Sequence, residues 1–248
     1  MTGPREALLG VNTVLAALTL RGRDCLGLLI SGSRSQSPAV AEIVELAEGL
    51  DIPVIPAAAA GLAGVDPHHQ GLCLLARPQR QPGLAALLEG FADEAPALIL
   101  ALDHVSDPRN LGALLRSAAV FGARGVLVPA DRAAPLTQAA RSASAGGSEV
   151  VPLVTVVNLA RALDVLKKRG FWVVGAGAGE GGELGSFQFP SRTVLVLGSE
   201  GRGLGRLVSR GADMWVGVPM AGQFVTSLNV SNAGAILMQA YFSQHGSG

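Results

Sequence analysis

Cysteine and aromatic residues are scarce in this sequence of 248 residues, and their scarcity excludes several classes of protein. The two cysteines, Cys25 and Cys73, allow no disulfide framework of the kind that stabilises small secreted domains. Both lie inside apolar runs without a cluster of further ligands, so we interpret them as reduced core residues. The adjacent His68 and His69 would point to opposite faces of an extended chain and are poor ligands for one ion. We therefore expect no bound metal.

The sequence also lacks a long hydrophobic run and an excess of charge of either sign. No apolar stretch approaches the ~20 residues that span a bilayer, and the N-terminus has no apolar signal core. We therefore expect a cytoplasmic protein without a membrane segment. Lysine and arginine together number 19, as do aspartate and glutamate, and this balance counts weakly against a nucleic-acid partner. A local basic face can still be hidden in a neutral total.

Small and aliphatic residues are abundant, with 33 glycines and a hydrophobic fraction of 49%. This composition supports a large core and is typical of an α/β protein with tight turns between strands and helices. Residues 1–77 are expected to form a first, small α/β domain. Apolar spacing there predicts helices over 5–20 and 38–49, a possible helix over 57–63, and strands over 25–30, 53–55 and 72–76.

A linker, residues 78–95, is expected to follow, because the stretch from Arg77 to Gly83 contains two prolines and mostly polar side chains. The second domain is expected over 96–248. Its first strand, 97–102, is apolar throughout, as in a parallel sheet buried on both faces. Further expected strands are 125–128, 150–154, 171–175, 194–198 and 216–222, and the expected helices are 110–121, 135–144, 158–169 and 233–242. This alternation predicts a mostly parallel sheet.

A glycine-rich stretch from Gly175 to Gly179 follows one of these strands and imitates a dinucleotide-binding loop. Glu180 occupies the position of the third glycine of that motif, and no apolar helix comes after it. We therefore interpret the stretch as an ordinary turn.

The region from Val194 to Met238 is the most informative part of the sequence. Two apolar strands each end in a glycine turn, and a polar segment, Ser227 to Asn232, then opens an apolar helix. Strand ends and helix N-termini present free backbone N–H and C=O groups, which is where ligands collect in α/β proteins. The pattern therefore predicts a ligand site formed by these turns.

Three segments resemble the sequence motifs of the SpoU family of RNA ribose 2′-O-methyltransferases, in the order and spacing of that family. The segment that resembles motif one is Asp107-Pro108-Arg109-Asn110-Leu111-Gly112 with the helix that follows. Motif two resembles Leu197-Gly198-Ser199-Glu200-Gly201, and motif three resembles Val218-Pro219-Met220 with Ser227-Leu228-Asn229-Val230-Ser231-Asn232-Ala233. The resemblance covers roughly the last 150 residues and is highly specific.

The resemblance implies an α/β methyltransferase domain of the SPOUT type over 96–248, with a trefoil knot in its C-terminal part, working as a homodimer. It also implies that residues 1–77 form a small α/β domain similar to ribosomal protein L30e, which binds the RNA substrate. Gly10 to Val14 and His69-Gln70-Gly71 are similar to that domain, although Asn12 stands where the family usually has histidine. Arg34 and His69-Gln70 are candidate RNA contacts in it.

The cofactor that the resemblance implies is S-adenosylmethionine (AdoMet), whose sulfonium is already a strong electrophile. The protein then has to hold the methyl group and the nucleophile in line and exclude water. Gly198 and Gly222 let the backbone approach closely, while Val218 and Leu228 can line the adenine. The expected cofactor-binding residues are Gly198, Val218, Met220, Gly222 and Leu228.

The polar positions that match the active site of the family are Asn110, Arg116, Glu200, Ser227 and Asn229. Arg116 lies off the apolar stripe of its helix. Because a guanidinium hardly gives up its proton, we interpret Arg116 as a phosphate-binding residue that stabilises the developing alkoxide. Glu200 is interpreted as an orienting carboxylate, and Ser227 and Asn229 as residues that hold the ribose or the loops.

The resemblance therefore implies methyl transfer from AdoMet to a ribose 2′-hydroxyl of RNA, with a guanosine of 23S rRNA as the expected target. Two alternatives stay open: a tRNA 2′-O-methyltransferase or a relative that methylates another rRNA ribose, and an rRNA-binding protein that has the fold without the activity. The matched polar residues Asn110, Arg116, Glu200 and Asn229 argue against the second alternative.

Overall fold

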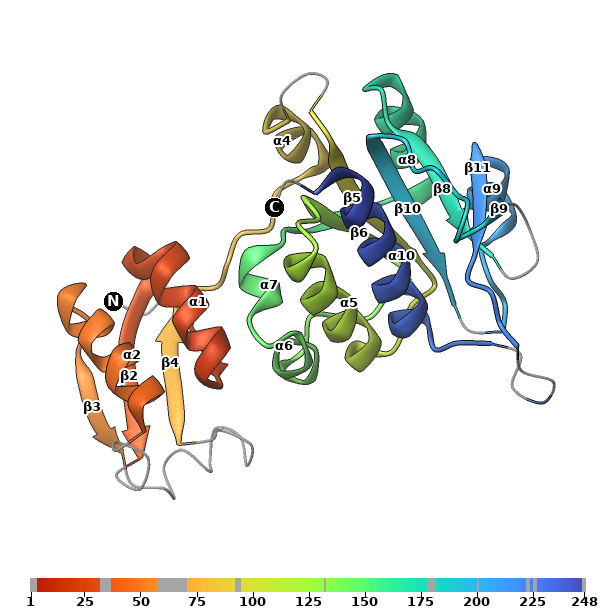
Figure 1. Ribbon diagram of the computed structural model, residues 1–248. Coiled ribbons are helices and arrows are strands. Elements are labelled where there is room, and N and C mark those ends of the chain that lie inside the picture. Colours follow the sequence, from red (N-terminus) through yellow and green to blue (C-terminus); the bar gives the residue numbers. More distant parts are fainter. Residues whose placement is uncertain are drawn as a thin grey trace. The chain divides into compact units, whose positions relative to one another are not determined.

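The computed structural model describes residues 4–31, 37–57, 71–91, 95–131, 133–177, 182–199, 201–221, 224 and 227–246 (Figure 1). The chain divides into two compact units. The first consists of Met1–Arg80 with Arg141–Val150, and the second of Gln81–Ala140 with Val151–Gly248. The grouping of Arg141–Val150 with the N-terminal residues is not predictable from local sequence patterns. Within the described ranges, no helix is both long and apolar enough to cross a membrane.

The first unit contains a four-stranded sheet in the order β1-β4-β2-β3. The strands are β1 (Glu6–Leu9), β2 (Cys25–Ser31), β3 (Val54–Ala57) and β4 (Leu72–Ala76). β4 is antiparallel to both β1 and β2, and β3 is parallel to β2. Helices α1 (Val11–Arg21) and α2 (Pro38–Gly49) pack on the sheet, where Val14, Leu18 and Ile43 are buried, and a short 3₁₀ turn (Gly22–Asp24) follows α1.

The expected helix over 5–20 is wrong in its first part, because residues 6–9 form β1. Gly10 precedes α1 with φ 87°, a conformation that a continuing helix cannot contain. Leu8 pairs with Leu74 of β4 and is fully buried there. Apolar spacing over four residues does not separate a strand from a helical turn, and pairing with β4 decides the outcome. Of the possible helix at 57–63, Ala57 belongs to β3 and the rest lies outside the described residues.

Both cysteines are free and buried in the first unit. Burial raises the pKa of the Cys25 thiol and of the Cys73 thiol to about 11. Both side chains are therefore protonated and unreactive at neutral pH, as core residues are.

Four charged side chains form a cycle of ion pairs within the first unit. Arg21 pairs with Glu6 at 2.6 Å and with Glu149 at 2.8 Å, and Arg141 pairs with the same two carboxylates at 2.8 and 2.9 Å. Burial of Arg21 would lower its pKa, but Glu149 and Glu6 outweigh this effect and raise the pKa above its usual value. The Glu149 side chain is completely buried, so the cycle explains why residues 141–150 group with this unit.

The second unit contains a seven-stranded sheet in the order β7-β6-β5-β10-β8-β11-β9. The strands are β5 (Ala97–Asp103), β6 (Gly125–Pro129), β7 (Leu153–Val156), β8 (Trp172–Ala176), β9 (Gly182–Glu183), β10 (Arg192–Gly198) and β11 (Met214–Gly217). Every pairing is parallel. The expected α/β fold with a mostly parallel sheet is therefore confirmed.

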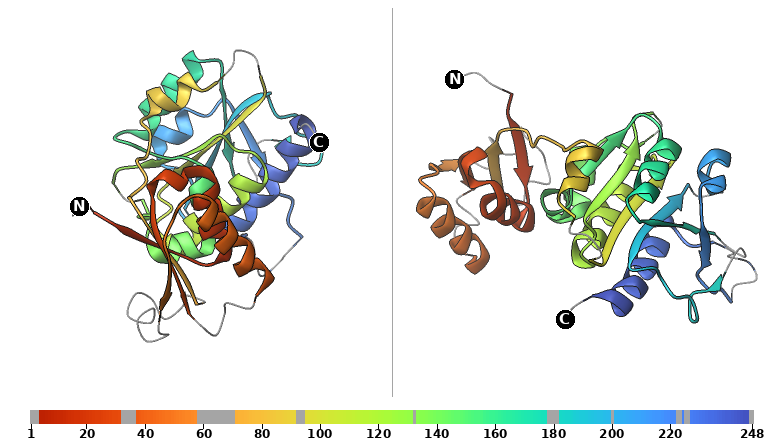
Figure 2. Two further views of the ribbon diagram at one scale, coloured as in Figure 1. Left: turned by 90° about the vertical axis from the view of Figure 1, so that its left-hand side faces the viewer. Right: turned by 90° about the horizontal axis from the view of Figure 1, so that it is seen from above.

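Helices cover both faces of this sheet (Figure 2). Outside the sheet, the helices after residue 80 are α4 (Leu84–Glu89), α5 (Pro108–Val120), α6 (Gln138–Ser144), α7 (Gly147–Val150), α8 (Leu159–Lys168), α9 (Arg206–Arg210) and α10 (Val230–His245). All seven residues of β5 are buried: Leu98, Leu100 and Leu102 face the core of α5 and α10, while Ile99 and Ala101 face that of α4 and α8. The uniformly apolar strand thus reflects a sheet with two buried faces.

Several element boundaries differ from the expected ones. Helix α5 begins at Pro108 and is capped by Asp107, whose carboxylate accepts a hydrogen bond from the Arg109 backbone N–H at 2.8 Å; Asn110 lies in the first turn. The expected strand 150–154 is displaced because Gly147–Val150 is helical. Strand β11 ends at Gly217, before Pro219. Helix α4 forms inside the expected linker because it buries Leu87 and Leu88 against the sheet.

Candidate functional site

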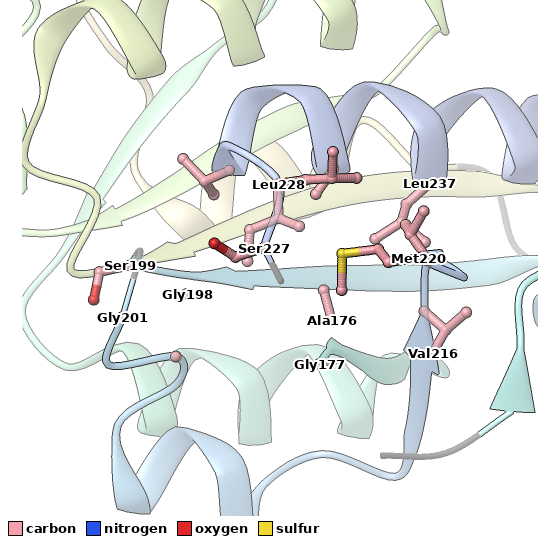
Figure 3. Close-up of a pocket in the computed structure, with 15 residues that line it drawn as sticks. Ala176, Gly177, Gly198, Ser199, Gly201, Val216, Met220, Ser227, Leu228 and Leu237 are labelled. Atoms are coloured by element: carbon pink, nitrogen blue, oxygen red, sulfur yellow. The ribbon is translucent and has the colours of Figure 1, made fainter. Parts of the chain in front are cut away.

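A cavity of about 280 Å³ opens at the carboxyl ends of three adjacent strands, β10, β8 and β11. It is lined by Ala176, Gly177, Leu197, Gly198, Ser199, Gly201, Gly203, Val216, Val218, Met220, Ser227, Leu228, Val230, Ala233 and Leu237. Figure 3 shows Leu228 and Leu237 on the α10 side of this space and Ala176 and Val216 on the strand side. The cavity thus lies where open α/β sheets bind ligands.

The loop after β10 is held very close to the end of its own strand. A Cβ atom on Gly198 would lie 2.3 Å from the Gly203 carbonyl carbon and 2.7 Å from the Leu204 nitrogen, so no side chain fits there. Gly203 donates its N–H to the Ser199 carbonyl at 2.9 Å, and Gly201 and Gly203 both have positive φ. The absence of side chains therefore shapes the cradle and leaves backbone groups facing the cavity.

A buried carboxylate fixes the far end of this loop. Asp103, at the end of β5, is 3% exposed and accepts the Gly205 N–H at 2.7 Å. His104 Nδ1 lies 2.7 Å from the other carboxylate oxygen, and His104 itself has φ 60°, a conformation that is uncommon for a residue with a side chain. Asp103 therefore orders the loop from Ser199 to Gly205, and the sequence analysis did not identify it.

The opposite wall of the cavity is apolar and comes from the approach to α10. Met220 is 40% and Leu228 is 37% exposed, which leaves apolar surface free at the cavity mouth. Helix α10 packs tightly behind this wall because Gly234 has no side chain: a Cβ there would lie 2.5 Å from Leu114 and 2.8 Å from Leu197. The wall can receive a flat, apolar ligand.

Two of the predicted polar residues, 119 positions apart in the sequence, meet in the structure. Asn229 Nδ2 donates to Asn110 Oδ1 at 3.0 Å. Asn229 also caps α10, since its Oδ1 accepts the Ser231 N–H at 2.8 Å and the Ser231 hydroxyl at 2.6 Å. This pair joins the start of α5 to the start of α10 beside the cavity-lining Ser227 and Leu228.

The predicted site residues fall into three groups. Those that line the cavity are Gly198, Val218, Met220, Ser227 and Leu228. Asn110 and Asn229 lie at the helix starts, and Glu200 and Gly222 lie outside the described residues. Arg116 is exposed on α5 and does not line the cavity. It follows Asn110 by about 9 Å along the helix and points in a direction about 120° away, so the two do not share a face.

Sequence reasoning missed Ala176 and Gly177, which line the cavity from the end of β8. They belong to the glycine-rich turn that was interpreted as ordinary because it fails the dinucleotide pattern. The turn was a signal for a ligand site, since β8 lies directly beside β10 and parallel to it. The sequence does not reveal that β8 and β10 are neighbours in the sheet, because β9 lies between them along the chain.

The described lining contains no acidic, basic, histidine or cysteine side chain. Among the residues that the structure describes, there is likewise no group of three or more such ligands that could hold a metal ion. The cavity therefore offers backbone hydrogen bonds and apolar contacts rather than acid–base groups. Such an arrangement can bind and orient a reactive ligand, and it relies on that ligand for reactivity.

Comparison with known proteins agrees with this picture. Residues 97–239 match the model of the SpoU rRNA Methylase family. The chain is 40% identical to the 23S rRNA (guanosine-2′-O-)-methyltransferase RlmB of Pseudomonas putida over 240 residues, which is 95% of both chains. It is also 37% identical to an uncharacterized tRNA/rRNA methyltransferase of Mycobacterium bovis, covering 96% of this chain and 74% of that one.

Solved structures share the fold. The crystal structure of the SpoU methyltransferase AviRb from Streptomyces viridochromogenes, in complex with AdoMet, matches with a TM-score of 0.76 at 23% identity. The match covers 98% of this chain and 91% of that chain.

Proposed function

This chain belongs to the SpoU rRNA methylase family, and from that premise we propose that it transfers a methyl group from AdoMet to the ribose 2′-hydroxyl of a guanosine in 23S rRNA. The family assignment made from the sequence is confirmed by the family model and by the relatives. The observation that carries the proposal is 40% identity over 95% of the chain to an enzyme with this name, together with the glycine cradle at the strand ends.

The residues present fit AdoMet. A Cβ on Gly198 would collide with the Gly203 backbone, so its absence lets the loop pass close to the strand end, where backbone groups can reach a ligand. We assign Val218 and Leu228 to the two sides of the adenine, with Met220 at the mouth. Gly222 and Glu200 are assigned to the same loops on the strength of the family motifs alone. When bound, AdoMet supplies an activated methyl group.

The remaining polar residues are assigned to the RNA. Asn110 and Asn229, joined by their hydrogen bond, are placed to hold the target ribose, with Ser227 next to them at the cavity. Arg116 is exposed and does not line the cavity, which suits a residue that binds an RNA phosphate and stabilises negative charge. Because the described lining has no titratable group, we expect the 2′-hydroxyl proton to leave to solvent or phosphate late in the reaction.

We also propose that the two domains expected from the sequence have separate functions. Residues 1–77 act as an L30e-like RNA-binding domain, and residues 96–248 form the methyltransferase domain. Residues 78–95 are the linker that connects the two domains. A ribose carries no sequence information, so the target must be selected through RNA shape and unpaired bases. The first unit has its own core, and none of its described residues lines the cavity, so it is available for that selection. The candidate contacts Arg34 and His69-Gln70 lie outside the described residues.

Two finer features of the second unit remain proposals. A trefoil knot is supported by the strand order, in which β10 lies between β5 and β8, and by α10, which returns to pack on α5. A homodimer is supported by apolar surface on α5 and α10, where Val120 is 68% exposed and Ile236 and Phe242 are each 38% exposed. Because its substrate is rRNA, we place the enzyme in the cytoplasm.

Calorimetric titration of the protein with AdoMet, in the presence of a chelator, tests the cofactor assignment. We expect binding of AdoMet and of its demethylated product without added metal. Absence of heat and of any thermal shift with both compounds would overturn the proposed function. The tRNA alternative is tested by offering tRNA beside rRNA as the methyl acceptor, and the non-catalytic alternative predicts transfer to neither.

A further inference from the structure

A row of three arginines begins at the cofactor cavity and runs along α9. Arg202, Arg206 and Arg210 are spaced four residues apart, and all three side chains are exposed. Within the described ranges, no acidic side chain forms an ion pair with any of them. Arg206 and Arg210 lie about 6 Å apart along one face of α9, where like charges repel. Binding of a polyanion would neutralise these charges and remove the repulsion between them.

The row has a fixed position relative to the cavity. Arg202 lies between Gly201 and Gly203, which both line the cavity. The Asp103 carboxylate holds the N–H of Gly205, the residue that immediately precedes α9, at 2.7 Å. Arg202 therefore lies next to the cavity, and Arg206 and Arg210 follow it along α9.

The surroundings of the row are basic as well. Helix α8 contacts α9. Lys168 and Arg169 are exposed at the end of α8, and Lys167 already pairs with Asp213 at 2.6 Å. Asp164 is the exposed acidic residue of α8. The surface therefore has an excess of positive charge.

The positive charge at this surface is local. The first unit contains seven basic and eight acidic side chains, and the second unit contains twelve basic and eleven acidic ones. The row of arginines is therefore a concentration of charge within a nearly neutral unit. Such a concentration can bind RNA phosphates, because phosphate binding depends on lysine and arginine.

We propose that Arg202, Arg206 and Arg210 form a phosphate-binding track for the RNA strand that enters the active site. The proposal rests on the proposed function, since the ribose to be methylated must lie at the cavity mouth and its neighbouring phosphates must lie within reach of it. Guanidinium groups bind phosphate through paired hydrogen bonds. Such contacts fix the register of the strand without reading its sequence, so the track supplies affinity and orientation, and the first unit supplies selection.

The test compares two exposed arginines of the second unit in the full-length protein. Arg206→Ala removes a member of the track, and Arg161→Ala is the matched control, because Arg161 is exposed on α8 and no ion pair involves it among the described residues. The binding of an unmodified 23S rRNA transcript is measured without AdoMet over a series of salt concentrations. Arg206→Ala should reduce the slope of log Kd against log salt by about 0.7, and the triple variant by about 2. Arg161→Ala should leave the slope unchanged.

Three further measurements make the result decisive. The loss of affinity should be the same for a scrambled RNA of equal length, because the track reads no bases, and Arg206→Lys should restore part of the slope. AdoMet binding measured by calorimetry should be unchanged in the triple variant, which separates failure of the track from failure of the proposed function. Equal slopes for Arg206→Ala and Arg161→Ala would overturn the proposal. So would a triple variant that dissociates into monomers, since the surface would then be a protein interface.

Discussion

At the scale of single residues, the shape of the cavity depends on positions without a side chain as much as on the side chains that are present. Gly198 can approach the Gly203 backbone only because Gly198 carries no side chain, and Asp103 then holds the loop through the Gly205 N–H. The sequence motif identified Gly198 as a cofactor residue, but the reason for it is visible only in the structure. Asp103 had no signal of its own in the sequence, because one carboxylate after a strand has many possible roles.

Replacing Gly198 by alanine should weaken AdoMet binding at least tenfold, or about 1.4 kcal/mol. The new Cβ would lie 2.3 Å from backbone atoms of Gly203, so the loop must move. Gly185→Ala is the control, because a Cβ there meets nothing within 4 Å. Calorimetry of both variants provides the measurement. Equal affinities would show that the cradle does not bind the cofactor.

Arg116→Ala should abolish methyl transfer and change AdoMet affinity by less than about threefold, or ~0.7 kcal/mol. The side chain is exposed on α5 and is absent from the lining of the cavity, so its role is expected on the RNA side. Single-turnover methylation and AdoMet titration on the same preparation separate the two effects. Loss of cofactor binding with normal turnover at saturating AdoMet would contradict this assignment.

At the scale of helices and strands, long elements with strong periodicity were predictable and short ones were not. Strand β5 and the stripe of Leu111, Leu114 and Leu115 on α5 follow directly from burial on one or two faces. Strand β1 was mistaken for helix because four apolar-rich residues fit both periodicities. Helix α4 was hidden in a proline-containing segment, since its burial against the sheet is a tertiary effect.

The cycle of ion pairs in the first unit should be a large contributor to its stability. Glu149→Gln removes the buried carboxylate that pairs with Arg21 and Arg141. Breaking a buried ion pair lowers the free energy of unfolding by about 3–5 kcal/mol. Asp24→Asn is the control, because Asp24 and Arg77 are about half exposed and 3.7 Å apart, and such pairs contribute ~0–1 kcal/mol. Urea unfolding of both variants gives the comparison. Similar small losses would mean that the cycle is weakly coupled to folding.

The apolar face of α5 and α10 should hold the homodimer together. Ile236→Glu places a charge on that face, and light scattering should show a shift from dimer to monomer upon dilution. Val157→Glu is the matched control, because Val157 is 94% exposed between β7 and α8, away from this face. A wild-type protein that methylates RNA as a dilution-resistant monomer would refute the dimer.

At the scale of the whole molecule, the sequence predicted the class of fold and much of the cavity, but not its arrangement. Val218, Leu228 and Gly198 come from three segments whose meeting depends on the strand order β10-β8-β11. In that order β10 lies between β5 and β8, although β8 precedes β10 in the sequence. Local sequence patterns contain no information about such a strand order. The family motifs supplied the link instead.

The grouping of residues 141–150 with the first unit is a second property that only the structure reveals. Glu149 and Arg141 find their partners more than 100 positions away, at Arg21 and Glu6. A truncated protein starting near residue 90 would therefore lose those partners as well as the proposed RNA-binding domain. Point substitutions in the full-length chain are the cleaner way to assign roles to the two units.

Methylation of a guanosine ribose in 23S rRNA can be measured by isotope transfer. Unmethylated 23S rRNA is incubated with the protein and AdoMet carrying a deuterated methyl group, and the RNA is digested to nucleosides for mass spectrometry. We expect label in 2′-O-methylguanosine, lost in Arg116→Ala, with none in tRNA treated in the same way. Label on a base, on another nucleoside, or on no nucleoside while AdoMet binds normally, would contradict the proposed function.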